Sequence, residues 1–571
     1  MRSILTLCSV LLLFSPLVAP QAWSQSAARE VRAVWLTTLL GLDWPVSSLR
    51  GDVVAQQKAL RDMFDDLERR NFNVVFFQVR SRGNAMYRSS MEPWGSELTG
   101  SLGKDPGWDP LDFAIREARQ RGLELHAWFN VFRVWSKGYP PVSSPRHIAL
   151  AQPSWVQRFG DDLWLDPGIP EAREYTIRVM EDIVRRYDVD GIHFDYCRYP
   201  DRGFNDEATW RQYGSGSARD DWRRNNVNHL VEHAYRRLTA IRPGLIVGSA
   251  PIGIYRNLPT ARGWEGRNAI YQDSRAWLEG GYHDYVAPQI YWGLTRNGSR
   301  IDFEALVRDW SRHDAGRHVY PGVAAYKNEI APYLHEHIDA TRIEGADGVV
   351  FFRYEHIRGE SFRGRFDQKT LAPPLTWRDY IRPNPPRALR VSRNDDVTIA
   401  SWDTPIPATD GDTASWYAVY AARDEHSINM LHAVLPATVR TCTLRGVASV
   451  LVTAVDKARN ESAAASVEAP ASEPVVLPAP SIPVSVARVS SLVPFAGTLA
   501  LLGFELPHTM FVRLRLMDEN GAEVQVLLDE FIDAGLHVIG IELERLRKNV
   551  VSYIFEIGDE RFNLPFEIDN E

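Results

Sequence analysis

Cysteine is scarce in this chain, with 3 residues among 571. Cys8 lies in an apolar run at the N-terminus, which leaves Cys197 and Cys442 for the rest of the protein. These two fall in different expected domains, so we expect no disulfide between them. No cluster of cysteine and histidine has the spacing of metal ligands. The sequence therefore predicts neither a metal site nor a cofactor.

A strong excess of one charge and long apolar runs are also lacking. The formal net charge is -8, which argues against nucleic acid as a partner. The apolar run of residues 5–17 is too short to span a membrane comfortably, and no later segment reads as a span. Arg2 precedes this run, and the small residues Ala22 and Ser24 follow it, which is typical of a signal peptide over residues 1–24. We expect an exported protein, periplasmic or extracellular, without a transmembrane segment.

Residues 31–357 alternate β-prone and helix-prone segments. A chain of 571 residues is too long for one core, so several domains are expected. Eight β-prone runs separated by helical patterns predict a (β/α)8 barrel, or TIM barrel, over residues 29–380. An open doubly wound sheet is the alternative, but the first strand ends in 37–45 without the Gly-rich turn of such sheets. The expected strands are 31–39, 73–80, 124–133, 191–199, 246–254, 286–292, 318–326 and 348–357, and the expected helices are 52–70, 110–121, 170–187, 221–241, 271–279, 302–312 and 328–344.

Two proline-rich segments, 382–386 and 469–485, predict linkers. Between them, residues 387–468 show short β-runs without a helical period and resemble a fibronectin type III domain. Residues 486–571 are also β-rich and resemble the immunoglobulin-like sandwiches of exported bacterial proteins. The expected fold class is therefore α/β, a TIM barrel followed by two small all-β domains. Such linkers predict few crossing contacts, so that residues 29–380 would fold alone.

Residues 191–200 hold the strongest candidate for chemistry. An apolar run leads from Gly191 into Asp195, as in a buried parallel strand with polar residues at its carboxyl end. Alternation along the strand places His193 and Asp195 on one face. If this face lines a barrel, Asp195 lies at the mouth, where barrel enzymes hold their catalytic residues, with His193 one layer below. The alternative is a structural Asp195 that holds the next loop.

Polar and aromatic side chains also gather at the carboxyl ends of the other expected strands. A hydrolase of glycosidic bonds needs one carboxyl group to protonate the leaving oxygen and another to attack or to activate water. Glu355 is the second candidate carboxyl, although pairing with Arg353 explains it equally well. Tryptophan is frequent, with 18 residues, and several beside the mouth are candidates for stacking on sugar rings. The candidate substrate-binding residues are Gln78, Arg80, Trp94, Trp128, Asn130, His193, Arg198, Gln289, Tyr291 and Trp292.

An ordered set of motifs resembles the bacterial glycosyl-hydrolase-like 10 family across about residues 29–380. The resemblance lies in 32–38, 43–45, 76–80, 92–100, 127–133, 191–200, 287–292 and 348–355. It implies a (β/α)8 domain related to the α-amylase-type barrels and action on peptidoglycan strands stripped of peptide. It also implies that Asp195 is the nucleophile, although His193 stands where those barrels have an arginine.

The fifth strand of α-amylase-type barrels ends in a glutamate that donates the proton. Residues 249–254 have no carboxyl group here, so Glu355, Asp43 or Glu92 would have to supply the proton. The missing group leaves open an alternative function, a glycan-binding scaffold protein without catalysis. A third hypothesis keeps the mechanism but takes an α-glucan as the substrate. The favoured hypothesis is an exported glycoside hydrolase whose partner is a cell-wall polysaccharide.

Overall fold

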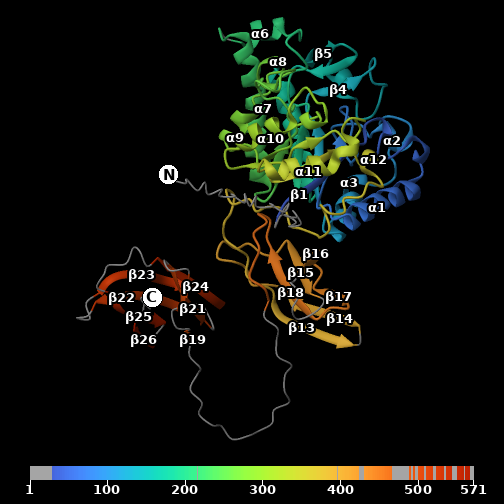
Figure 1. Ribbon diagram of the computed structural model, residues 1–571. Coiled ribbons are helices and arrows are strands. Elements are labelled where there is room, and N and C mark those ends of the chain that lie inside the picture. The colour runs from blue at the N-terminus through green and yellow to red at the C-terminus, as the bar shows by residue number, and fades with distance from the viewer. Residues whose placement is uncertain are drawn as a thin grey trace, which may run out of the picture. The chain divides into compact units, whose positions relative to one another are not determined.

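The computed structural model describes residues 29–214, 216–394, 396–422 and 430–465, and strands between 488 and 565 (Figure 1). The chain divides into two compact units, residues 1–470 and 471–571. The expected signal peptide, residues 1–24, lies outside the described residues. Among the residues that are described, no helix combines the length and the apolar character needed to cross a membrane.

The first unit contains a closed barrel of parallel strands, which confirms the predicted fold class. Its strands are β1 (Val31–Leu36), β2 (Val74–Arg80), β3 (Glu124–Asn130), β7 (Gly191–Asp195), β8 (Ile246–Ser249), β9 (Tyr285–Val286), β10 (His318–Val319), β11 (Gly322–Val323) and β12 (Gly348–Phe352). They pair in the order β10-β9-β8-β7-β3-β2-β1-β12-β11. β10 and β11 are two halves of one strand interrupted at Pro321, which has no N–H for the ladder. Pairing of β10 with β9 and of β11 with β12 therefore closes an eight-stranded barrel.

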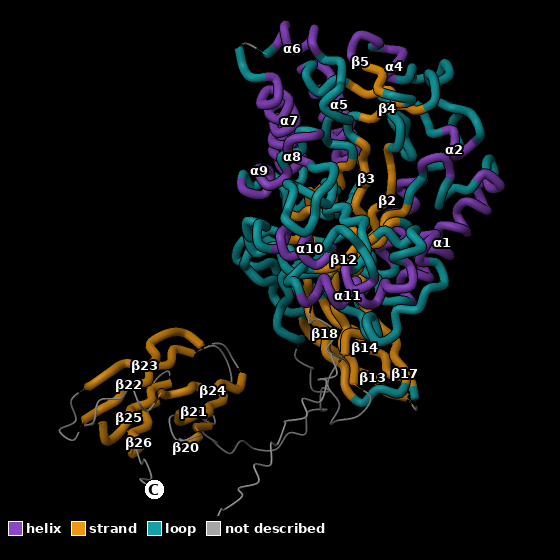
Figure 2. Tube along the Cα trace, turned by 45° about the horizontal axis from the view of Figure 1, so that its top comes forward, coloured by secondary structure: helices purple, strands orange, loops and turns teal. Residues whose placement is uncertain are grey.

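Helices cover the outer face of this barrel, as Figure 2 shows. The Asp52 side chain caps α1 (Val53–Arg69) by accepting the Ala55 N–H at 2.9 Å. Proline occupies the first position of α3 (Pro110–Gln120) and α5 (Pro170–Arg186), where its missing N–H is not needed. The other outer helices are α7 (Arg219–Ile241), α9 (Ser274–Glu279), α10 (Phe303–Ser311), α11 (Leu334–Ile343) and α12 (Tyr354–Ile357).

The interior of the barrel is filled with aromatic and histidine side chains. Alternation along the strands turns Trp35, Phe76, His193 and Tyr285 inward. His193 stacks on Phe76 with 4.1 Å between ring centroids, and its Nε2 accepts a hydrogen bond from Trp35 Nε1 at 2.9 Å. Tyr285 Oη lies 2.9 Å from His193 Nδ1 and 2.9 Å from His126 Nδ1. The barrel is thus a packed core, and a site must lie above this layer, at the carboxyl ends of the strands.

Additional elements extend the loops at the carboxyl ends of the strands. A small antiparallel sheet of β4 (Arg133–Ser136), β5 (Val156–Phe159) and β6 (Asp162–Leu165) lies in the connection from β3 to β7. Short helices α2 (Ser96–Thr99), α4 (Ile148–Ala151), α6 (Glu207–Tyr213) and α8 (Gly266–Ala269) lie in the same set of loops. Figure 1 shows α6, β4 and β5 at one end of the barrel, and the two small sheets formed by residues 387–455 lie at the other end.

Several elements are shorter than the sequence predicts. The expected strand 286–292 is reduced to Tyr285–Val286, after which Gln289 makes isolated bridges to Ile252 and Gly322. β12 ends at Phe352, because its last partner in β1 is Trp35, and the chain then enters α12. Glu355 therefore lies on α12 and not on the strand expected over 348–357, and Arg353 pairs with Asp43 rather than with Glu355.

Two three-stranded antiparallel sheets follow the barrel, which confirms the predicted all-β region. They contain β13 (Arg387–Asn394), β14 (Val397–Asp403), β15 (Trp416–Ala422), β16 (Met430–Pro436), β17 (Thr441–Arg445) and β18 (Ser449–Val455), in the orders β13-β14-β17 and β16-β15-β18. Trp402 of one sheet packs edge-on against Tyr417 of the other, with 5.4 Å between ring centroids. The resemblance to a fibronectin type III domain stays a prediction.

Ion pairs, one of them largely buried, join the barrel to these sheets, so the expectation of few contacts across residues 382–386 is wrong. Arg459 follows β18 and enters the amino-terminal end of the barrel, where it pairs with Glu124 of β3 at 2.5 Å. Its Nη1 also lies 3.3 Å from Tyr320 Oη. Arg29, just before β1, pairs with Glu461 at 2.5 Å. The sheets thus complete the floor of the barrel.

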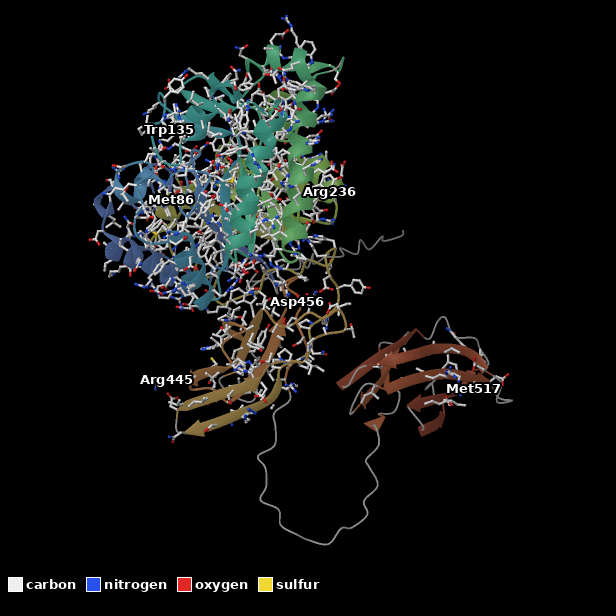
Figure 3. The ribbon with its side chains drawn as sticks, turned by 180° about the vertical axis from the view of Figure 1, so that it is seen from behind. Met86, Trp135, Arg236, Arg445, Asp456 and Met517 are labelled. Atoms are coloured by element: carbon white, nitrogen blue, oxygen red, sulfur yellow. The ribbon has the colours of Figure 1, made fainter. Side chains whose placement is uncertain are left out.

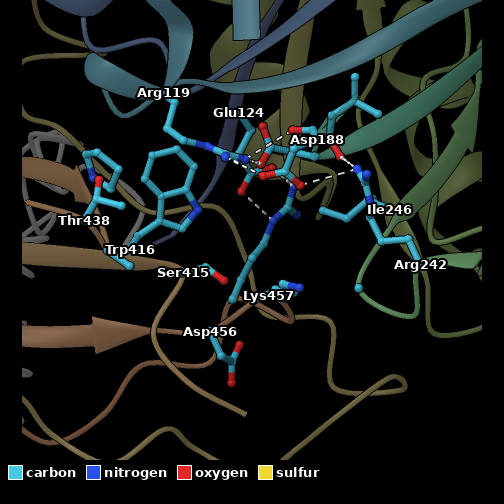
Figure 4. Close-up of a pocket in the computed structure, with 16 residues that line it drawn as sticks. Arg119, Glu124, Asp188, Arg242, Ile246, Ser415, Trp416, Thr438, Asp456 and Lys457 are labelled. Carbon is cyan, nitrogen blue, oxygen red and sulfur yellow. Dashed lines mark hydrogen bonds and ion pairs between the residues drawn. The ribbon is translucent and has the colours of Figure 1, made fainter. Parts of the chain in front are cut away.

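A cavity of about 190 Å³ with several charged side chains in its lining lies at this junction (Figure 4). Arg119 and Asp188 line it from the barrel and pair at 2.5 Å, whereas Trp416 and Lys457 line it from the sheets. Figure 3 shows Asp456 at the same junction. Barrel enzymes hold their sites at the carboxyl ends of the strands, so this amino-terminal cavity is not the place for the chemistry.

The second unit is β-rich in its described residues, as predicted. It contains β19 (Arg488–Val489), β20 (Val493–Phe495), β21 (Leu499–Leu506), β22 (Met510–Asp518), β23 (Glu523–Ile532), β24 (Gly535–Glu542), β25 (Val550–Ile557) and β26 (Glu560–Pro565). β22 and β23 pair antiparallel, as their alternating pattern indicates, and Val512, Leu514 and Leu516 are buried. The residues between these two strands, 519–522, lie outside the described part.

Candidate active site

Asp195 ends β7 and lies at the mouth of the barrel, in register with Asn130 at the end of β3. The residue is 9% exposed. Its Oδ1 accepts the Tyr196 backbone N–H at 2.7 Å and Gln289 Nε2 at 3.3 Å. Gln289 also donates to the Ala250 carbonyl at 3.0 Å, which fixes the orientation of its amide. Two donors, one just after β7 and one after β9, thus hold this carboxyl group.

Burial raises the pKa of Asp195 to about 6, because the charged form is poorly solvated at this depth. The Tyr196 N–H and the Arg198 charge act in the opposite direction. The Trp128 indole also favours the charged form, although its Nε1 makes no hydrogen bond of acceptable geometry within the described residues. A carboxyl group whose pKa lies near neutral pH, at a barrel mouth, is suited to exchange protons.

Tyr196, which follows β7, and side chains from the β3–β7 connection form one wall beside Asp195. Tyr196 has a φ of 50°, a left-handed conformation that is costly for a residue with a Cβ atom. Its ring lies 5.8 Å from that of Trp164. Arg133 lies 5.2 Å above the Tyr196 ring and pairs with Asp162 at 2.9 Å. This wall thus combines strained backbone, aromatic faces and an ion pair.

Aromatic residues form the remaining walls of the mouth. The ring of Tyr291 lies 5.6 Å from Phe352 and 6.2 Å from Tyr326. Tyr326 is 42% exposed, and Trp264, in the loop after β8, is 46% exposed. Exposed aromatic faces of this kind can stack on the apolar faces of sugar rings.

Three predicted substrate-binding residues are buried and engaged by the protein itself. Gln78 Oε1 accepts three hydrogen bonds from the turn that follows β1. Arg80 pairs with Glu92 at 2.6 Å, and both side chains are fully buried. Asn130 Nδ2 donates to the Ser81 carbonyl at 2.8 Å. These contacts shape the loops around the mouth, and direct binding of substrate by these residues stays a prediction.

The other predicted substrate-binding residues divide into two sets. Trp94, Trp128 and His193 are buried, at 7%, 3% and 0% exposure, and Trp292 is half-buried against the outer core. Arg198, Gln289 and Tyr291 lie around Asp195, since each contacts it or changes its charge balance. The structure therefore brings together at the carboxyl group a subset of the predicted residues.

The predicted proton donor Asp43 is held on several sides. It is buried, and it accepts the backbone N–H groups of Thr37 at 2.9 Å and Glu355 at 3.1 Å. It also forms an ion pair with Arg353. Asp43 thus joins the end of β1 to the start of α12, and its role in proton transfer stays a prediction.

Glu92 and Glu355, the other predicted donors, differ in accessibility. Glu92 is buried, and besides Arg80 it accepts a hydrogen bond from Tyr175 Oη at 3.2 Å. Glu355 lies on α12, its side chain is 47% exposed, and its nearest ion-pair partner is Arg358 at 3.7 Å. In strand order, α12 follows the eighth strand and Asp195 ends the fourth, so Glu355 and Asp195 stand on opposite sides of the barrel.

Sequence reasoning did not identify Asp162, Trp164 or Trp264 as part of the mouth. The first two belong to β6, whose alternating sequence Asp162-Leu163-Trp164-Leu165 carries a strand signal inside a segment that we expected to be a loop. Trp264 lies in the loop after the fifth strand, which the sequence did not single out. A search for short alternating runs within long loops would have found β6.

We expect the activity of this protein to rise with pH through about pH 6 if Asp195 acts in its ionised form. The reason is that burial raises its pKa above the ordinary value of 3.8, so Asp195 is protonated at pH 5. The rate at low substrate concentration, measured between pH 4.5 and pH 8, tests this. An activity that falls above pH 6 would instead make Asp195 the proton donor.

Residues 30–337 match the sequence profile of the glycosyl hydrolase-like 10 family. The chain is 34% identical over 438 residues to glycosyl hydrolase YngK of Bacillus subtilis (strain 168), covering 71% of this chain and 85% of that protein. It is also 34% identical over 379 residues to glycosyl hydrolase DigH of Escherichia coli (strain K12), covering 59% of this chain and 86% of that protein. Among solved structures, the glycoside hydrolase domain of PgaB (BpsB) from Bordetella bronchiseptica aligns with a TM-score of 0.42 at 14% identity, over 58% of this chain and 96% of that one. The chain therefore belongs to the glycosyl hydrolase-like 10 family, and it is a glycoside hydrolase.

Proposed function

We propose that this protein cleaves glycosidic bonds with Asp195 as the catalytic carboxylate, acting as the nucleophile or as the base that activates water. The observation that carries the proposal is the position of Asp195 at the mouth, oriented by Gln289 and the Tyr196 N–H. A two-carboxyl mechanism needs such a fixed oxygen beside the anomeric carbon. The strained backbone at Tyr196 supports the same role, because strain of this kind gathers at functional sites.

The second carboxyl group in this proposal protonates the leaving oxygen. Of the three predicted donors, Asp43 and Glu92 are engaged in buried ion pairs, whereas Glu355 remains accessible. Glu355 is thus the accessible one of the three, but it stands across the barrel from Asp195, so which carboxyl group donates the proton stays a prediction. Trp264 and Tyr326 supply exposed ring faces on which neighbouring sugars can stack.

The substrate in this proposal is the glycan strand of the cell wall after removal of its peptides. What supports it is the family resemblance, together with the predicted signal peptide that would carry the enzyme to the cell envelope. The substrate is a polysaccharide, and the mature protein acts in the periplasm or outside the cell.

We expect the purified mature protein to shorten peptide-free peptidoglycan strands and to leave cross-linked sacculi largely uncut. Separation of the products by size, followed by mass analysis, measures both activities. Starch serves as the comparison polymer in the same assay. If sugars were released from starch as readily as from peptide-free strands, the substrate would be an α-glucan instead.

A further inference from the structure

Within the described residues, Arg198 forms no ion pair with a carboxylate, unlike four other arginines around the mouth. Arg80, Arg82, Arg133 and Arg353 each form an ion pair with an aspartate or a glutamate. In the described part of the chain, the one hydrogen bond given for Arg198 runs from Nη1 to the Tyr199 carbonyl at 3.2 Å. Toward the residues that the structure describes, most donors of this guanidinium group are therefore unused beside the candidate catalytic carboxyl.

Three aromatic rings surround the Arg198 guanidinium. Its central carbon lies 5.4 Å from the ring of Trp164, 5.1 Å from Tyr196 and 4.9 Å from Trp264. Rings at these distances stabilise the cation and hold the plane of the group, but they accept few hydrogen bonds. A planar fork of free N–H donors in such surroundings matches the two oxygens of a carboxylate.

The burial of Arg198 also favours an anionic ligand. Burial lowers the pKa of its guanidinium, while Tyr196, Asp195 and Asp162 oppose that change and Arg133 adds to it. A half-buried cation that forms no ion pair within the described residues gains when an anion binds directly to its N–H groups. Trp264 is exposed, so one wall of this cage faces the solvent from which a ligand would enter.

We propose that Arg198 binds the free lactyl carboxylate of a muramic acid residue in the glycan strand, next to the bond that is cut. This inference rests on the proposed function and names the group that selects the substrate. In intact peptidoglycan the same carbonyl carbon forms an amide with the peptide and carries no charge. Hydrolysis of that amide releases the peptide amine and leaves the carboxylate, so an amide-hydrolysing step must supply the substrate.

Binding to the Asp195→Asn variant tests the inference without cleavage of the ligand. The ligands are peptide-free strands and the same strands with their lactyl carboxylates converted to methylamides. Hydrogen bonds to charged groups contribute about 1.5–3 kcal/mol, so the carboxylate form should bind about 10- to 100-fold more tightly. Adding Arg198→Gln should abolish this preference and leave binding of the methylamide form unchanged, while Arg198→Lys should retain part of it.

Arg202→Gln is the matched control, because this nearby exposed arginine donates to the Asn268 carbonyl away from the three rings. Its variant should keep the full preference for the carboxylate. If Asp195→Asn bound the two strand forms with equal affinity, the inference would be overturned. It would also be overturned if adding Arg198→Gln weakened the binding of both forms equally. An unmodified protein that binds the carboxylate form selectively but cuts neither strand would uphold this inference and refute the proposed cleavage.

Discussion

The Asp195→Asn variant is expected to cut glycan strands about 100- to 10,000-fold more slowly than the unmodified enzyme, which is the range that one general acid or base contributes. The substitution keeps the shape of the side chain and removes the charge and the reactive oxygen. The melting temperature should stay the same or rise, because a buried carboxyl group held for function is costly to the fold. Rate and melting temperature measured on one preparation separate this role from a structural one.

The pH dependence of the free energy of unfolding provides a second measurement on the same variant. Because the folded-state pKa of Asp195 lies above its unfolded value, its contribution to stability is present below about pH 4 and is lost as pH rises through 6. A shift from 3.8 to about 6 corresponds to on the order of 3 kcal/mol. Between pH 4 and pH 7, the free energy of unfolding of Asp195→Asn should therefore rise relative to that of the unmodified protein.

Asp347→Asn provides the matched control for Asp195→Asn. Burial raises the pKa of Asp347 to about 6 as well, but this residue lies at the amino-terminal end of the barrel, where it accepts the Val319 N–H at 2.9 Å. Its variant should show a similar pH-dependent change in stability and a near-normal rate. Full activity in a folded Asp195→Asn variant would contradict our assignment and direct the search to Glu355 and Asp43.

The largest effect on stability is expected from Arg459→Met, which should lower the free energy of unfolding by about 3–5 kcal/mol at pH 7, the usual result of breaking a buried ion pair. Burial by itself would raise the pKa of Glu124, but Arg459 and His126 outweigh it and lower that pKa to about 2. Without Arg459, the buried carboxylate is uncompensated. Chemical denaturation monitored by tryptophan fluorescence measures the loss.

Two further variants define the origin of this loss. Adding Glu124→Gln should restore part of the stability, because it removes the uncompensated charge. Lys58→Met breaks an exposed pair with Asp62 and should change stability by less than about 1 kcal/mol. In Arg459→Met, Glu124 takes up a proton at low pH, so the deficit should be smaller at pH 4 than at pH 7. A deficit that does not change with pH would show that lost packing, rather than charge, is responsible.

Local periodicity predicted the parts of the site that lie on strands. Alternation within 191–199 placed Asp195 and His193 on the inner face, and the structure has His193 in contact with Trp35 and Tyr285 inside the barrel. Gln289, which the sequence placed at the end of the sixth strand, reaches Asp195. Such features follow from the two-residue period of a strand, which is independent of distant partners.

The sequence was less informative where a side chain finds its partner across two loops. Nothing local indicates that Arg80 is neutralised by Glu92, or that Asp43 is held by Arg353, because these pairs form only when the loops fold over the mouth. The cage around Arg198 likewise takes its rings from β6, the residue after β7 and the loop after β8. The end of β12 was predicted too late in the sequence for a related reason. This strand ends where its pairing with β1 ends, which the local sequence does not indicate.

Because Arg459 reaches into the floor of the barrel, its ion pair with Glu124 constrains how this sequence can change during evolution. A mutation that neutralises either Arg459 or Glu124 alone leaves the other charge buried, so a lineage can lose the pair only through a destabilised intermediate. A recombination event that moved the barrel into another gene without residues 387–465 would leave Glu124 in the same condition. We therefore expect a barrel that lacks these sheets to carry a substitute for Arg459 or an uncharged residue at the position of Glu124.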